Sequence, residues 1–102
     1  MYASYADVKI QSGKMAEAIQ LSKDLIPQIG EVPNIKRFMV IDKGDDKAVF
    51  LAFYDTAEDQ EAATPKAQEI IGRLAALAAA PPERVQVEVA IDHTYQTSPA
   101  GG

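Results

Sequence analysis

Hydrophobic side chains occupy both alternating faces of two neighbouring segments in the middle of the chain, residues 35–42 and residues 47–54. A strand with one face in water alternates apolar and polar side chains, whereas a strand that is apolar on both faces is covered twice. Residues 43–46, a lysine, a glycine and two aspartates, are typical of a hairpin turn. The pattern therefore predicts two paired strands that are covered on both sides.

A strand and a helical region are predicted before this hairpin. Residues 2–10 alternate as a strand, and apolar residues at helical spacing predict a helix over residues 13–30. Ser12 is the expected N-cap of this helix, because its hydroxyl can accept a bond from an orphan backbone N–H. Pro27 lies inside the pattern and lacks an N–H, so we expect a kink or a loosened last turn there, with Gly30 ending the helix.

A second helical region and a last strand are predicted after the hairpin. Asp55 or Thr56 is expected to cap the helix. Thr64 and Pro65 interrupt the pattern, and because proline favours the first turn of a helix, we predict that a second helical piece starts there. Residues 84–92 alternate almost perfectly and form the clearest strand of the chain.

The order of elements predicts an α+β fold. Strand, helix, strand, strand, helix, strand with right-handed crossovers gives the ferredoxin-like βαββαβ arrangement, a four-stranded antiparallel sheet with both helices on one face. Two helices cover one face only, so the second apolar face predicts a homodimer in which two sheets pack together as a dimeric α+β barrel. We expect one domain over residues 1–93 and a flexible C-terminal tail over residues 94–102, which are small and polar.

Composition excludes several classes of function. The net charge is −5 and no basic cluster is present, so neither nucleic acid nor a membrane surface is an expected partner. The chain has no cysteine, which excludes disulfides and thiolate chemistry and fits a cytoplasmic location. Asp42, Asp45 and Asp46 are close in sequence but are better explained as a charged turn, so we predict no metal and no cofactor.

The chain also resembles a known family in three places. The first place is an opening strand at Met1 and Tyr2 that leads into Ser12, Gly13 and Lys14. The second is the helix end at Leu25, Ile26 and Pro27, followed by Pro33, Asn34 and Ile35. The third is the hairpin end at Phe53, Tyr54 and Asp55. Over residues 1–93 it looks like the antibiotic-biosynthesis-monooxygenase-like group of dimeric α+β barrels. The resemblance implies a homodimer and oxygenation of a small aromatic compound without a bound cofactor.

One branch of that family does not fit the residues present. Its haem-degrading members are associated with an asparagine, a tryptophan and a histidine. This chain has no tryptophan, and its single histidine, His93, follows the last predicted strand. We therefore do not expect haem to be a substrate.

Tyr54, Arg37 and His93 are the candidate catalytic residues. Tyr54 and Arg37 lie on the central hairpin, where a phenol and a guanidinium could orient an oxygenated aromatic ring, provided that both face the helices. His93 is the side chain whose ordinary pKa lies near neutrality, so it could act as a general base. Tyr5 is the candidate substrate-binding residue.

Each candidate also has a structural explanation. Tyr5 and Tyr54 could be half-buried core residues with satisfied hydroxyls, and His93 could be a solvated residue at a strand end. Arg37 could pair with Glu88 or Asp7 across the sheet, or reach solvent at an edge. Gln86 and Glu88 break the apolar pattern of the last strand, so they face either a wet pocket or the outside.

Two functions are consistent with this sequence. The first is a cofactor-independent monooxygenase that acts on a small aromatic compound, and the alternative is a non-catalytic small-molecule-binding or structural homodimer. An open pocket lined by Tyr5, Arg37, Tyr54 or His93 would favour the enzyme. A filled pocket would favour the alternative.

Overall fold

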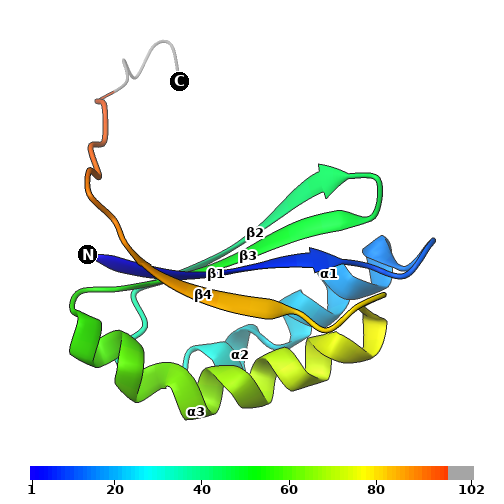
Figure 1. The fold of residues 1–102 in the computed structure, drawn as a ribbon, viewed down its shortest axis with the longest axis horizontal. Coiled ribbons are helices and arrows are strands. Elements are labelled where there is room, and N and C mark those ends of the chain that lie inside the picture. The colour runs from blue at the N-terminus through cyan, green and yellow to red at the C-terminus, as the bar shows by residue number, and fades with distance from the viewer. Residues whose placement is uncertain (97–102) are drawn as a thin grey trace.

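A computed structural model of the chain describes residues 1–96. The elements are β1 (Tyr2–Lys9), α1 (Met15–Asp24), α2 (Ile26–Ile29), β2 (Arg37–Gly44), β3 (Lys47–Tyr54), α3 (Ala57–Leu74), a 3-10 turn (Ala75–Leu77) and β4 (Glu83–Glu88). The strands form one antiparallel sheet in the order β2-β3-β1-β4. All the helices lie on one face of this sheet (Figure 1). The predicted α+β ferredoxin-like fold is confirmed.

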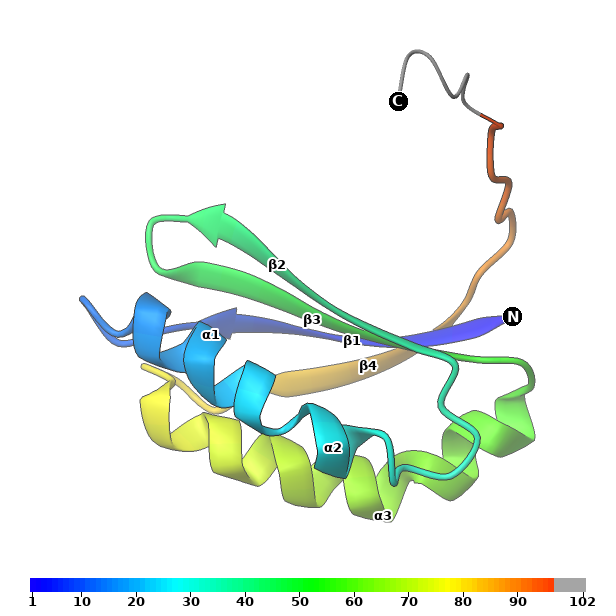
Figure 2. The same cartoon turned by 180° about the vertical axis from the view of Figure 1, so that it is seen from behind.

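The hydrophobic core lies between the sheet and the helices (Figure 2). On the two central strands, Ala6 lies opposite Phe50 and Val8 lies opposite Ala48, and all four side chains are buried. From the helices, Ile70 and Leu74 of α3 belong to the same buried cluster. Even-numbered residues of β1 and β3 therefore face the helices, as the alternation of a strand requires.

The other face of the sheet, which we call the open face, is not covered by any helix of residues 1–96 (Figures 1 and 2). Strand alternation and register place on it Met39, Ile41, Val49, Leu51, Phe53, Val85 and Val87. Ile41, Val85 and Val87 keep 42%, 39% and 38% of their surface exposed. The prediction that both faces of β2 and β3 are apolar is confirmed, with one face covered and one bare in the single chain.

Strand β4 turns polar side chains toward the helices and apolar side chains away from them. Arg84 lies opposite Ala6 and Gln86 lies opposite Ser4, so the polar side chains of β4 face α3. Val85 and Val87 face the open side instead. A strand whose apolar side faces away from its own helices favours a second covering layer over the open face.

The β2–β3 hairpin turns through two residues in the left-handed region. Asp45 and Asp46 have φ values of 54° and 58°, as a type I′ turn requires. Gly44 also has a positive φ, 80°, and the register shifts between Asp42 and Gly44. The turn predicted for residues 43–46 is confirmed, with a bulge beside it.

The helix ends agree with the sequence in part. Pro27 lies in the first turn of the short helix α2, so the break predicted there is confirmed. Thr56 caps α3, since its Oγ1 accepts a hydrogen bond from the Asp59 backbone N–H at 3.0 Å. The predicted cap at Ser12 is wrong: α1 begins at Met15 after Lys14, which makes no side-chain cap.

Helix α3 runs without interruption through Pro65, so the predicted division into two pieces is wrong. Pro65 is exposed, and the carbonyl that its missing N–H leaves unpaired belongs to Glu61, which is also exposed to water. Ala63 before the proline and Ile70 after it are both buried against the sheet. Packing of both halves on one face keeps the helix continuous, overriding local propensity.

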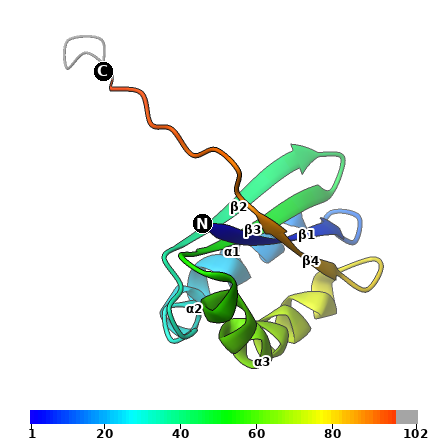
Figure 3. The ribbon, with the colours of Figure 1, turned by 60° about the vertical axis from the view of Figure 1, so that its left-hand side comes forward.

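Strand β4 is shorter than the predicted strand of residues 84–92. It ends at Glu88, and the next backbone bond, from Val89 N–H to the Met1 carbonyl, is 2.9 Å long. Its partner β1 begins at Tyr2, which lies opposite Glu88, and the paired register of the two strands ends there. The chain leaves the sheet there (Figure 3). Residues 97–102 of the predicted tail lie outside the described residues.

Candidate functional site

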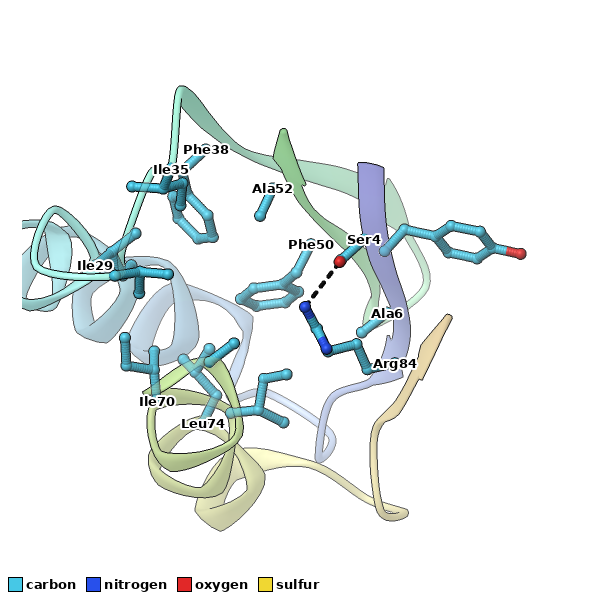
Figure 4. Close-up of a pocket in the computed structure, with 14 residues that line it drawn as sticks. Ser4, Ala6, Ile29, Ile35, Phe38, Phe50, Ala52, Ile70, Leu74 and Arg84 are labelled. Atoms are coloured by element: carbon cyan, nitrogen blue, oxygen red, sulfur yellow. Dashed lines mark hydrogen bonds between the residues drawn. The ribbon is translucent and has the colours of Figure 1, made fainter. Parts of the chain in front are cut away.

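A small cavity lies between the sheet and the helices. It has a volume of about 60 Å³ and opens toward solvent. Its wall is mainly apolar, with large side chains from Ile29, Phe38, Phe50, Ile70 and Leu74 (Figure 4). Ser4 and Arg84 add polar groups on the side formed by β1 and β4. An apolar space with a polar group at one wall is the usual form of a small-molecule site.

Arg84 is held at this wall by two hydroxyl groups. Its Nη2 donates to Ser4 Oγ at 2.9 Å, and its Nη1 donates to Thr64 Oγ1 at 3.0 Å. Arg84 is half-buried. Among residues 1–96 no carboxylate lies within 4.0 Å of the Arg84 guanidinium. The ion pairs in this part of the chain join other residues.

Two glutamines complete the polar cluster around Arg84. The Gln60 amide is buried and donates to the Ala3 carbonyl at 2.7 Å and to Ser4 Oγ at 3.1 Å. The Gln86 amide donates to Thr64 Oγ1 at 3.2 Å. We call Ser4, Gln60, Thr64, Arg84 and Gln86 the Arg84 cluster. It joins β1, α3 and β4, which fixes the guanidinium at the cavity wall.

Tyr54 lies beside this cluster. It is fully buried on the helix-facing side of β3, and its hydroxyl makes no hydrogen bond to any described residue. Burial raises the pKa of Tyr54 above its usual value, and the nearby Arg84 guanidinium opposes that increase. The phenol therefore stays protonated at neutral pH and has an unused donor.

The residues proposed from sequence are not brought together. Tyr54 faces the helices, but Arg37 lies opposite Phe53 on the open face and is exposed. Arg37 thus fails the condition that it share a face with Tyr54. Tyr5 forms part of the cavity wall, yet its position opposite Leu51 puts its side chain on the open face.

His93 is also distant from the cavity. It lies five residues beyond the last residue of β4, is exposed, and meets the Tyr95 ring edge-on at a centroid distance of 4.5 Å. Arg37 makes no ion pair with Glu88 or Asp7, and Asp7 lies 3.5 Å from Lys43 instead. The catalytic and substrate-binding roles of Tyr54, Arg37, His93 and Tyr5 stay predictions.

Sequence reasoning missed Arg84, Ser4 and Thr64. One signal was present, because Gln86 and Glu88 were recognised as polar positions of the last strand. Arg84 shares their parity, and a strand places such residues on one side. Ser4 and Thr64 carry no signal of their own, since small hydroxyl residues are common in strands and helices alike.

Within residues 1–96, no three His, Cys, Asp or Glu side chains lie close enough to bind a metal ion together. Over the same residues, no helix combines the length and the apolar character needed to cross a bilayer.

Solved structures of low sequence identity share this fold. A candidate antibiotic biosynthesis monooxygenase from Bordetella bronchiseptica superposes with a TM-score of 0.74 at 12% identity, covering 88% of this chain and 97% of that one. A candidate antibiotic biosynthesis monooxygenase from Nitrosomonas europaea has a TM-score of 0.70 at 18% identity, covering 89% and 100%. A mutant of MhuD with two manganese protoporphyrin IX molecules per active site has a TM-score of 0.71 at 14% identity, covering 93% and 100%.

These likenesses define the fold class, which is that of the antibiotic biosynthesis monooxygenase structures. No family model and no curated protein matches the chain in sequence. The predicted resemblance is confirmed at the level of the fold. Similarity below 20% identity carries no substrate with it.

Proposed function

We propose that this chain is a homodimeric protein that binds a small, mainly apolar compound in the cavity between its sheet and its helices. The observation that supports this most directly is the cavity itself, with its apolar wall and the Arg84 cluster at one side. An aromatic ring would contact Phe38, Phe50 and Ile70. A polar substituent on the ring would reach the guanidinium.

The size of the cavity limits the ligand. Its volume of about 60 Å³ is well below the ~150 Å³ of an engineered cavity that binds benzene. A ring can enter only if part of the wall moves. Phe38 is the best candidate for that movement, because it lies half-buried on the edge strand β2 and its centroid is 6.4 Å from that of Phe50.

The homodimer is supported by the open face. Seven large apolar side chains lie on it, and monomeric proteins rarely expose contiguous apolar patches of more than a few hundred Å². A second copy presents the same apolar face, so a two-fold symmetric pair would cover both faces at once. The resemblance to a family of dimeric barrels supports the same assembly.

Oxygenation of the bound compound is the second candidate function. It is supported by the names of the structural neighbours and by the unused hydroxyl of Tyr54 beside Arg84. In such a reaction an activated methylene and O₂ give a carbonyl and water, so the substrate supplies the electrons. Arg84, which lines the cavity, would stabilise the oxygen on which negative charge develops.

Haem is a poor fit for this cavity, although MhuD holds porphyrins in its active site. The cavity is far smaller than a porphyrin, and His93 lies outside it on the exposed segment after β4. We therefore keep the prediction that haem is not a substrate.

A titration with benzyl alcohol tests the proposed binding. We expect saturable shifts in the amide NMR signals of residues that line the cavity, and we expect Ala67→Leu to abolish them by filling the space. Ala62→Leu is the matched control, because Ala62 is on the same helix but is exposed and outside the cavity. Equal shifts in both variants, or none in the parent protein, would contradict the proposal.

Oxygen uptake in the presence of anthrone separates the two candidate functions. An enzyme should consume O₂ faster than the same solution without protein, and Ala67→Leu should remove the difference. Saturable binding of benzyl alcohol without any added O₂ uptake would favour the non-catalytic alternative.

A further inference from the structure

We propose that the Arg84 cluster is a recognition site for an anionic oxygen, so the ligand of the cavity is a small apolar skeleton that carries one carboxylate or phenolate group. This inference deepens the proposed function and rests on it.

The Arg84 cluster holds more donors than it uses. Arg84 has five N–H groups, of which two are accounted for by Ser4 and Thr64. Ser4 Oγ accepts from both Arg84 and Gln60, which uses both of its acceptor positions and leaves its own O–H free to donate. The remaining N–H groups of Arg84 and the Ser4 hydroxyl are therefore left at this wall as donors for an added acceptor.

The charge of Arg84 is also uncompensated. Five of the ten basic residues form ion pairs within residues 1–96, namely Lys14, Lys36, Lys43, Lys66 and Arg73, and Arg84 is the half-buried basic residue at the cavity wall that does not. Arg84 is bonded to neutral hydroxyls instead, although the chain has 15 acidic residues against 10 basic ones. A half-buried guanidinium without a carboxylate leaves its site ready for an anion from outside.

The position of the cluster connects this charge to the cavity. Arg84 and Ser4 are both in the cavity wall, and the guanidinium points toward Ser4 at one side of the apolar space (Figure 4). Ile70 and Leu74 form the apolar wall on the helix side. A ligand whose carbon skeleton fills the apolar space therefore places a terminal oxygen against Arg84.

Benzoate and benzamide form the decisive pair of probes, because they have the same shape and differ in charge. We expect benzoate to bind the native protein at least about tenfold more tightly than benzamide, in line with the greater strength of hydrogen bonds to charged groups. Arg84→Gln should remove this preference while leaving benzamide affinity nearly unchanged. Arg73→Gln is the matched control, since Arg73 lies on α3 and bonds Gln28 outside the cavity.

Two further variants keep the test decisive if Arg84→Gln fails to fold. Arg84→Lys keeps the charge but loses the two-pronged geometry, so the preference for benzoate should shrink without vanishing. Ser4→Ala should weaken benzoate and spare benzamide. At pH 8, 4-nitrophenolate separates the two anion classes: binding stronger than that of benzoate identifies a phenolate site, and weaker binding identifies a carboxylate site.

The outcomes distinguish this inference from the proposed function. Equal affinity for benzoate and benzamide, unaffected by Arg84→Gln or Arg84→Lys, would overturn the anion site and leave the cavity as a binding site for neutral compounds. Absence of saturable binding for every probe, including benzyl alcohol, would overturn both.

Discussion

At the scale of single residues, Tyr54 is buried at a cost in stability. Its ring fills the core at complete burial, yet its hydroxyl has no hydrogen-bond partner among the described residues. A buried donor left unsatisfied costs about 1–3 kcal/mol of stability. Phenylalanine would fill the same space without that cost, so the hydroxyl is better explained by what it does beside Arg84 than by packing.

We therefore predict that Tyr54→Phe does not destabilise the protein, and that it raises the free energy of unfolding by up to about 1 kcal/mol at pH 7. Because burial raises the pKa of folded Tyr54 above 10.0, the native protein keeps this residue's full contribution below pH 10 and loses it as the pH rises through the folded pKa. The phenylalanine variant has no such loss. Its advantage should grow above pH 10.

Urea unfolding at pH 7 and at pH 10.5 measures both effects. Tyr5→Phe is the control, since Tyr5 is on the open face and is only half-buried. A clear loss of stability in Tyr54→Phe at pH 7 would mean that the hydroxyl is paired and structural.

At the scale of elements, the β2–β3 turn is correct in type but not optimal in sequence. Asp45 and Asp46 both occupy the left-handed region, with φ values of 54° and 58°. Aspartate tolerates this region better than most residues, but a two-residue type I′ turn favours Asn-Gly most strongly. A turn sequence with a stronger preference for this conformation should therefore make the fold more stable.

We predict that the double variant Asp45→Asn with Asp46→Gly raises the free energy of unfolding by about 1 kcal/mol through relief of the left-handed conformation. Thermal unfolding followed by circular dichroism measures it. The reversed pair, Asp45→Gly with Asp46→Asn, controls for the loss of two charges. If the double variant melts at or below the parent temperature, the turn is not of type I′ in solution.

The same scale shows how far local sequence decides an element. Thr56 and Pro27 act where the sequence predicted, because capping and the missing proline N–H are local effects. Pro65 did not break α3, and β4 stopped early at Glu88. These outcomes depend on packing against the sheet and on where β1 begins, which no window of sequence contains.

At the scale of the whole molecule, the open face is an apolar surface that the single chain leaves uncovered. Val85 and Val87 face it, while polar Arg84 and Gln86 take the side toward the helices. This arrangement is explained if the valines are covered by a second sheet, since their present exposure, 39% and 38%, leaves them in water.

We predict that Val87→Asp converts a dimer into a folded monomer. Burial of an unpaired carboxylate between two sheets costs several kcal/mol, whereas in the single chain Val87 is exposed and the substitution leaves the core intact. Light scattering at micromolar concentration should give twice the chain mass for the parent and the chain mass for the variant, with unchanged far-UV circular dichroism. Ala62→Asp, on the exposed side of α3, should remain a dimer.

If the parent protein has the mass of a single chain in that experiment, the homodimer proposal is wrong. A variant that unfolds would contradict the expectation that the single chain is stable on its own.

The order of the elements, the hairpin and the apolar character of both strand faces were predictable from the chain, because periodicity and turn chemistry act within a few residues of each other. Which side each strand presents depends on how the strands pair in the folded sheet. A shift by one residue reverses every side chain of a strand, and that is why Arg37 lies on the open face while Arg84 reaches the cavity. The Arg84 cluster joins residues 80 and 20 positions apart, so its existence depends on strand register and on the continuity of α3, and neither is visible in any short stretch of the chain.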